Sequence, residues 1–123
     1  MQKKVVNILI ADDEPRIRKA MRSIFEQESF NVSEACDGYE CLVSVKKNSY
    51  DVIFLDIKMP KIDGVEVLSQ IKLMGCTTPV IMICGFANEY LVNHCLELGA
   101  FDFLHKPFDL YKVLSALTSA LAV

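Results

Sequence analysis

Three acidic residues of this chain follow directly on apolar segments of strand length. Asp12 and Asp13 come after VVNILIA (5–11), and Asp56 comes after VIFL (52–55). Carboxylates that lie close together repel one another, so their charge needs a nearby cation. Mg²⁺ meets this need, because it takes oxygen ligands and commonly combines one or two carboxylates with water and a phosphate. The acids therefore predict a magnesium site.

Two other polar groups also follow apolar segments. Cys84 ends VIMIC (80–84), and Lys106 comes shortly after FDFL (101–104). An ammonium group across from a bound cation suits a tetrahedral anion such as a phosphoryl group. Aspartate is a recognised acceptor of phosphoryl groups. The set therefore predicts a site that binds a phosphoryl group, with a carboxylate within reach as the nucleophile.

Each of these residues also fits an ordinary structural role when it is considered alone. Asp13 and Asp63 stand where an acid can cap a helix, and Lys106-Pro107 is typical of a turn. Cys84 fits a small buried residue. Their joint placement after successive apolar segments favours the functional interpretation.

The elements that position these residues follow from the spacing of apolar residues. Segments of strand length alternate with segments whose apolar residues recur every three or four positions, which is typical of helices. In the first helix this spacing predicts that Ala20 faces inward, and Asp37-Gly38 predicts a turn. The predicted strands are 5–11, 30–35, 52–56, 80–84 and 101–104. The first predicted helix begins near Pro15, and the other four cover 39–47, 65–74, 87–98 and 110–121.

Alternating strands and helices favour an α/β fold with a parallel sheet covered on both faces. Strands 5–11, 52–56 and 80–84 are almost entirely apolar and belong in the middle, whereas 30–35 and 101–104 are mixed and belong near the edges. We expect an open, five-stranded, doubly wound sheet, since a closed barrel needs eight such units. Ligands bind at the carboxyl ends of the strands in such sheets, where the acids, the thiol and the ammonium are expected to meet.

The composition of the 123-residue chain fits one globular domain, with 52% apolar and 24% charged residues. A net charge of −3 with interspersed signs gives no indication of a nucleic-acid or membrane surface. Five cysteines without zinc-like spacing predict reduced thiols and a cytoplasmic location. No segment of the sequence is long enough to span a bilayer.

The segments LIADDEP, VIFLDIKMPKIDG, VIMICGFAN and GAFDFLHKPF resemble, in order and spacing, the motifs of the receiver domain of two-component response regulators, the CheY-like family. The resemblance covers essentially the whole chain, so residues 1–123 are expected to form a single receiver domain. It implies strand order 2-1-3-4-5 and phosphoryl transfer from a sensor histidine kinase or a phosphotransfer protein. Beyond Mg²⁺-dependent self-phosphorylation and autodephosphorylation, it implies no enzyme activity.

Carried over position by position, the resemblance implies a role for each site residue. Asp56 is the expected phosphoacceptor, and Asp13 and Asp56 are expected to ligate Mg²⁺. Asp12 would act mostly through water, and Lys58 would contribute its backbone carbonyl. Lys106 would contact the phosphoryl oxygens.

Three residues concern the switch that the family uses. Cys84 stands where the family usually has Thr or Ser, and a thiol is a weaker hydrogen-bond donor on a larger atom, which weakens the expected coupling to loop movement. Phe103 occupies the position of the aromatic switch residue but lacks a hydroxyl group. Pro107 is expected to follow a cis peptide bond.

Phe86 and Lys58 flank the phosphorylation site at positions that influence acyl-phosphate hydrolysis in the family. We expect Phe86 to shield Asp56 from water.

The output surface is expected on the fourth helix, fifth strand and fifth helix, where it would bind an output domain or a downstream protein, or form a homodimer on phosphorylation. Its candidate residues are Tyr90, Val92, Phe101 and Tyr111.

Three other functions compete with a phosphorylated switch. An atypical receiver would act by protein binding with little phosphorylation, which Cys84 leaves open. A phosphatase with an aspartyl-phosphate intermediate requires an acidic residue at the position of Lys58. A flavin-binding protein of this fold requires a loop that binds phosphate after the first strand, and the acidic sequence DDEP (12–15) at that place would repel a phosphate. The chain is expected to be either a stand-alone regulator or a fragment of a longer one.

Overall fold

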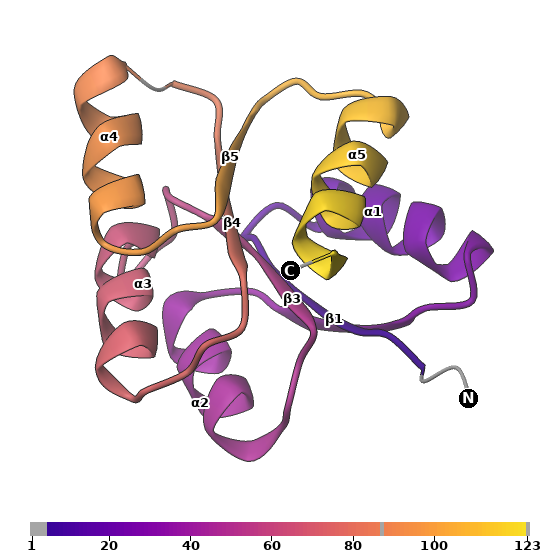
Figure 1. Cartoon of the computed structure of the whole chain (residues 1–123), viewed down its shortest axis with the longest axis horizontal. Helices are drawn as coiled ribbons and strands as arrows, with labels where there is room; N and C mark the ends of the chain where they lie inside the picture. Colours follow the sequence, from indigo (N-terminus) through magenta and orange to yellow (C-terminus); the bar gives the residue numbers. More distant parts are fainter. Residues whose placement is uncertain (1–4, 87, 123) are drawn as a thin grey trace.

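The computed structural model describes residues 5–86 and 88–122. Within these ranges the chain forms a parallel sheet of five strands in the order β2-β1-β3-β4-β5, connected by five helices (Figure 1). The strands and helices alternate throughout, which confirms the predicted doubly wound α/β fold and strand order. The elements are β1 (Asn7–Ala11), α1 (Pro15–Gln27), β2 (Asn31–Ala35), α2 (Gly38–Lys47), β3 (Val52–Asp56), α3 (Gly64–Leu73), β4 (Val80–Cys84), α4 (Glu89–Glu97), β5 (Asp102–His105) and α5 (Leu110–Leu121).

Two layers of helices cover the sheet. Helices α2, α3 and α4 lie on one face, and α1 and α5 lie on the other (Figure 1). Since successive side chains of a strand point to opposite faces, β3 serves both layers. Leu55 packs in the core with Leu68 of α3, whereas Phe54 packs against Phe25 of α1 with ring centroids 5.3 Å apart.

The central strands are buried on both faces, as their apolar sequences predict. Every residue of β3 and β4 is buried, whereas β2 and β5 at the edges include exposed positions. This burial holds the carboxyl ends of β1, β3 and β4 in fixed register. Residues at and just after those strand ends are therefore attached to the buried centre of the fold.

Helix caps decide where several elements begin. The side chain of Asp63 accepts from the Glu66 amide at the start of α3, which confirms a capping role. Asp37 does the same for α2, so Gly38 is the first residue of that helix rather than part of a separate turn. The capping alternative for Asp13 is wrong, because the residue at the cap of α1 is Glu14.

Other differences from the predicted elements are small. Helix α4 begins at Glu89 with Asn88 as its cap, two residues later than predicted, and Ala87 lies outside the described residues. Strand β5 begins one residue late because its pairing with β4 starts at Asp102. Ala20 is exposed, contrary to prediction. None of the helices in the described ranges has the length and apolar character needed to cross a membrane.

Candidate functional site

The carboxyl ends of β1 and β3 bring the three predicted acids together. These strands are neighbours in the sheet, with Ala11 opposite Leu55, so the residues that come next also lie near one another. One carboxylate oxygen from each of Asp12, Asp13 and Asp56 lies within 4.8 Å of the others. Asp12 and Asp56 are buried and Asp13 is exposed. The structure therefore brings these acids into one cluster that is open to solvent on one side.

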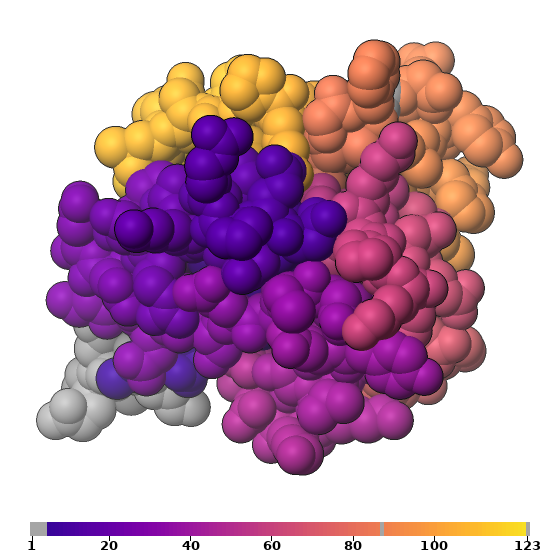
Figure 2. All heavy atoms as spheres, turned by 180° about the vertical axis from the view of Figure 1, so that it is seen from behind, coloured from indigo at the N-terminus to yellow at the C-terminus, as the bar shows by residue number. Residues whose placement is uncertain are grey.

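The cluster belongs to one face of the molecule. In Figure 2 the indigo segment that spans the end of β1 and the start of α1 lies between the yellow α5 and the pink segment that follows β3. These segments are far apart in sequence and meet because all of them leave the same edge of the parallel sheet.

Asp12 is held tightly by its neighbours. Its amide donates to the carbonyl of Ala35 at 3.1 Å, and its Oδ1 accepts from the amide of Glu14 at 2.9 Å. Its Oδ2 is buried, and its polar neighbour among the described residues is the ammonium group of Lys106 at 3.2 Å, whose geometry is not that of a hydrogen bond. A buried carboxylate oxygen that shares one lysine with other acids is poorly compensated, so this atom fits a site beside a bound cation.

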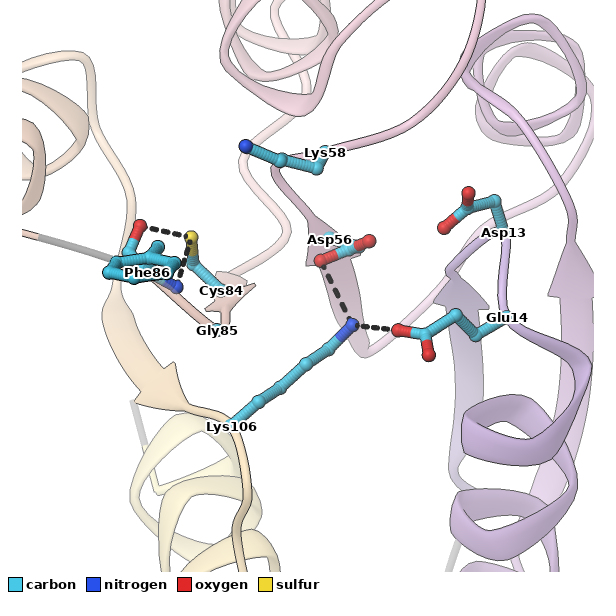
Figure 3. A pocket seen from close by; sticks show the side chains of 8 residues that line it. All are labelled: Asp13, Glu14, Asp56, Lys58, Cys84, Gly85, Phe86 and Lys106. Carbon is cyan, nitrogen blue, oxygen red and sulfur yellow. Dashed lines mark hydrogen bonds and ion pairs between the residues drawn. The ribbon is translucent and has the colours of Figure 1, made fainter.

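Lys106 reaches the acids from the end of β5. Its Nζ lies 2.7 Å from Oε1 of Glu14 and 3.4 Å from Oδ1 of Asp56 (Figure 3). It also lies 3.2 Å from Oδ2 of Asp12. The peptide bond between Lys106 and Pro107 is cis, as predicted. The predicted placement of Lys106 beside the acids Asp12, Asp13 and Asp56 at a single edge of the sheet is therefore confirmed.

Burial and charge shift the pKa values of this cluster. Burial, together with the charge of Asp12, raises the pKa of Asp56 to about 7, although Lys106 opposes the rise. Burial also raises the pKa of Asp12. Burial disfavours the ammonium form of Lys106, but the hydrogen bond to Glu14 and the charges of Asp12 and Asp56 outweigh this effect and raise its pKa. The single positive charge of Lys106 thus does not neutralise the two buried carboxylates of Asp12 and Asp56. A divalent cation bound beside them would neutralise the remaining negative charge.

Glu14 is a site residue that the sequence reasoning missed. It forms the shortest of the three ion pairs of Lys106, and this hydrogen bond lowers the pKa of Glu14. Its position directly after Asp12 and Asp13 was an available signal. However, nothing in the sequence indicates which carboxylate will meet a lysine that lies 92 positions away.

A cavity of about 360 Å³ opens beside Asp56 (Figure 3). Cys84 and Phe86 form one wall. The thiol of Cys84 donates to the carbonyl of Phe86 at 2.8 Å and accepts from its amide at 3.4 Å, so it bonds with its own loop. The Phe86 side chain is 86% exposed and lies at the rim. The lining residues are Asp13, Glu14, Asp56, Lys58, Cys84, Gly85, Phe86 and Lys106.

The loop after β3 closes against Asp56 because of a glycine. The amide of Gly64 donates to the carbonyl of Ile57 at 2.6 Å. A Cβ atom at position 64 would lie 2.1 Å from the backbone oxygen of Asp56, well inside van der Waals contact. The Asp63-Gly64 pair in the sequence therefore has two separate uses: the acid caps α3, and the glycine allows the start of α3 to pack on the end of β3.

The residues predicted for switching and output lie near the site or on the α4–β5–α5 face. Phe103 is half-buried, with its ring 5.3 Å from that of His105. Tyr90 and Tyr111 are each 79% exposed, whereas Val92 and Phe101 are half-buried. The side chain of Lys58 is exposed beside the pocket. The roles predicted for these residues stay predictions.

Comparison with known proteins gives one consistent family. The sequence profile of the response regulator receiver domain matches residues 8–118. The transcriptional regulatory protein ResD of Bacillus subtilis is 37% identical over 108 residues, which are 88% of this chain and 45% of ResD. SrrA of Staphylococcus aureus is 37% identical over 102 residues, 83% of this chain and 42% of SrrA. The chain thus spans about half the length of the curated relatives it matches.

Solved structures agree with this family. A chain of the CheX–CheY–BeF3–Mg²⁺ complex from Borrelia burgdorferi superposes with a TM-score of 0.89 and 40% identity, covering 93% of this chain and 87% of that one. A CheY-like receiver domain protein from Methanospirillum hungatei gives a TM-score of 0.92 at 26% identity, covering 97% and 95% of the two chains.

Proposed function

The chain belongs to the response regulator receiver domain family, and we propose that Asp56 is the residue on which it accepts a phosphoryl group. One observation carries the proposal. A buried carboxylate at the end of β3 lies in a cluster with two other acids and 3.4 Å from the ammonium group of Lys106. Receiver domains act in two-component signal transduction, and this one has a buried carboxylate, a cluster of three acids and an ammonium group at one edge of its sheet.

The reaction would use the side chains as the pocket presents them. A carboxylate oxygen of Asp56 forms a bond to phosphorus while the bond from phosphorus to the donor's imidazole nitrogen breaks, and the imidazole keeps the electron pair. Lys106 would exchange its contact with Asp56 for the phosphoryl oxygens. The catalysis of phosphoryl transfer is mainly positioning and charge stabilisation. The ends of the paired strands would position Asp56, and Lys106 would stabilise the charge.

The oxygen cluster fits Mg²⁺, which we propose as the cofactor. Asp13 and Asp56 would ligate it directly, Asp12 mostly through water, and Lys58 through its backbone carbonyl. The buried Oδ2 of Asp12, whose negative charge is met only by an ammonium group that Asp56 and Glu14 share, supports this assignment. When bound, the ion would neutralise the acids and the charge on the transferring group.

Transfer can be tested with acetyl phosphate and Mg²⁺, by intact mass. We expect the wild type to gain one phosphoryl group and Asp56→Asn to gain none. Asp63→Asn is the matched control: it alters an aspartate of the same loop, and asparagine also caps helices, so uptake should be unchanged. Uptake by Asp56→Asn equal to that of the wild type would contradict the assignment.

The partners follow from the family and are part of the proposal. A sensor histidine kinase or a phosphotransfer protein would donate the phosphoryl group. An output domain or downstream protein would bind the α4–β5–α5 face, where the exposed rings of Tyr90 and Tyr111 lie. The relatives ResD and SrrA are transcriptional regulators about twice as long as the matched region, which supports an output domain in a longer protein. Homodimer formation on phosphorylation and a single receiver unit over residues 1–123 stay predictions.

The atypical receiver gains no support over this function. Its motivation was the thiol at position 84, but the acids and Lys106 are all in place around the pocket. The Cys84 thiol is directed toward its own loop and leaves Asp56 accessible from the pocket. We therefore expect Cys84 to alter the response to phosphorylation more than the uptake itself.

A further inference from the structure

Arg18 of α1 contacts the backbone of the acidic loop. Its Nη1 donates to the carbonyl oxygen of Asp12 at 2.6 Å, and its Nε donates to Oε1 of Glu34 at 2.9 Å. The side chain is only 16% exposed. Arg18 lies outside the pocket and touches none of the three carboxylate groups, so the proposed reaction gives it no role.

The carbonyl that Arg18 holds belongs to the peptide bond between Asp12 and Asp13. The amide of Asp12 is held by Ala35, and its Oδ1 is held by the amide of Glu14. The contact with Arg18 fixes the next peptide unit, and the orientation of that unit sets the direction in which Asp13 leaves the chain. Because Asp13 is exposed, packing does little to orient it.

Glu34 makes this use of an arginine compatible with a cation site. An uncompensated guanidinium group near the acid cluster would repel a divalent ion. Glu34 neutralises it and is held from the other side by Arg22, whose Nε lies 2.5 Å from Oε2 of Glu34. Arg22 lowers the pKa of Glu34 through this hydrogen bond, and Arg18 adds to the effect. Glu34 thus stays charged and holds the Arg18 side chain in place.

We propose that Arg18, oriented by Glu34, is a positioning residue that sets the geometry of the metal-binding loop. The inference rests on the proposed function in one respect, namely that Asp12, Asp13 and Asp56 bind Mg²⁺. Groups that orient metal ligands typically change metal affinity by about 10- to 100-fold when they are removed. A fold-change of this size is therefore expected for Mg²⁺ binding when the contact with the Asp12 carbonyl is lost.

The variants Arg18→Ala and Arg22→Ala separate positioning from charge and from stability. Each removes one positive charge and one partner of Glu34, but only Arg18 bonds the Asp12 carbonyl; Arg22 instead bonds Glu26 and the carbonyl of Val32. The loss of a positive charge alone would tighten Mg²⁺ binding. A weakened affinity in Arg18→Ala is thus opposite in sign to the charge effect.

The experiment measures the Kd for Mg²⁺ by titration calorimetry and the thermal unfolding of each metal-free variant. We expect Arg18→Ala to bind Mg²⁺ about tenfold or more weakly than the wild type, and Arg22→Ala to bind within about twofold of it. Arg18→Lys is the second variant. It keeps donors for the Asp12 carbonyl but lacks the planar fork that holds this carbonyl and Glu34 in fixed directions, so its loss should be smaller.

Three outcomes of the Mg²⁺ titrations would contradict a part of this proposal. A wild-type Kd within twofold of that of both Arg18 variants would overturn the inference and leave the proposed function standing. Equal weakening in Arg18→Ala and Arg22→Ala would also overturn it, because general loosening of α1 would then explain both. A wild type that does not bind Mg²⁺ would overturn the cofactor assignment itself.

Discussion

Replacement of Asp56 by asparagine should stabilise the metal-free protein at neutral pH. Asparagine has nearly the shape of aspartate but carries no charge, so it imitates the protonated carboxyl group. Burial and the neighbouring charge of Asp12 raise the pKa of Asp56 from 3.8 to about 7. Between about pH 4 and pH 7 the folded chain therefore holds a proton that the unfolded chain releases, and the free energy of unfolding falls as the pH rises through this window.

The pKa difference sets the size of the effect. A tenfold difference in proton affinity corresponds to about 1.4 kcal/mol. The rise from 3.8 to about 7 then costs the folded state up to about 4 kcal/mol at pH 7 and above, and only about 0.5 kcal/mol at pH 4. Asp56→Asn removes this cost, so its gain in the free energy of unfolding should grow from near zero at pH 4 to a few kcal/mol at pH 8.

Urea unfolding in the presence of EDTA at pH 4, 6 and 8 measures this gain. Glu97→Gln is the control, because it removes one negative charge from an exposed position of α4, and it should change the free energy of unfolding by less than about 0.5 kcal/mol at every pH. A gain from Asp56→Asn that is the same at pH 4 and pH 8, or a loss at pH 8, would show that the pKa of Asp56 is not raised in the folded chain.

Three further predictions concern the pocket. Lys106→Ala should slow phosphoryl uptake from acetyl phosphate by about 100-fold or more, because a fixed charge for the transferring group is lost; a rate within threefold of the wild type would contradict this role. Phe86→Ala should shorten the lifetime of the phosphorylated form if the ring excludes water, and an unchanged dephosphorylation rate would exclude shielding. Cys84→Thr, which supplies a hydroxyl donor, should change phosphorylation-dependent hydrogen exchange in residues 85–90 more than the rate of uptake; equal changes in both would count against a switching role.

The sequence was sufficient to predict the fold because its strands are so distinct. VIFL (52–55) and VIMIC (80–84) are apolar throughout, and only a sheet covered on both faces buries such strands completely. The edge positions of β2 and β5 followed in the same way from their mixed sequences. Local capping was harder to predict. Asp37-Gly38 has the composition of a turn, but the Asp37 side chain accepts from the Glu40 amide and so begins α2.

The site was predictable to the extent that backbone topology determines it. Residues that directly follow the central strands must meet at one edge of the sheet, so Asp12, Asp13 and Asp56 could be placed together before the structure was known. Contacts made by long side chains were not predictable in this way. The ion pair of Glu14 with Lys106 and the bond from Arg18 to Asp12 depend on side-chain conformations and on residues brought together only by folding.

The chemical identity of the phosphorylated residue shows whether Asp56 is the phosphoacceptor. Borohydride reduces an aspartyl phosphate to homoserine, and peptide mass mapping then locates the altered residue. After incubation with acetyl phosphate, we expect homoserine at position 56 and nowhere else, in an amount that depends on added Mg²⁺. Homoserine at another position, or the same yield at position 56 in the presence of EDTA, would contradict this expectation.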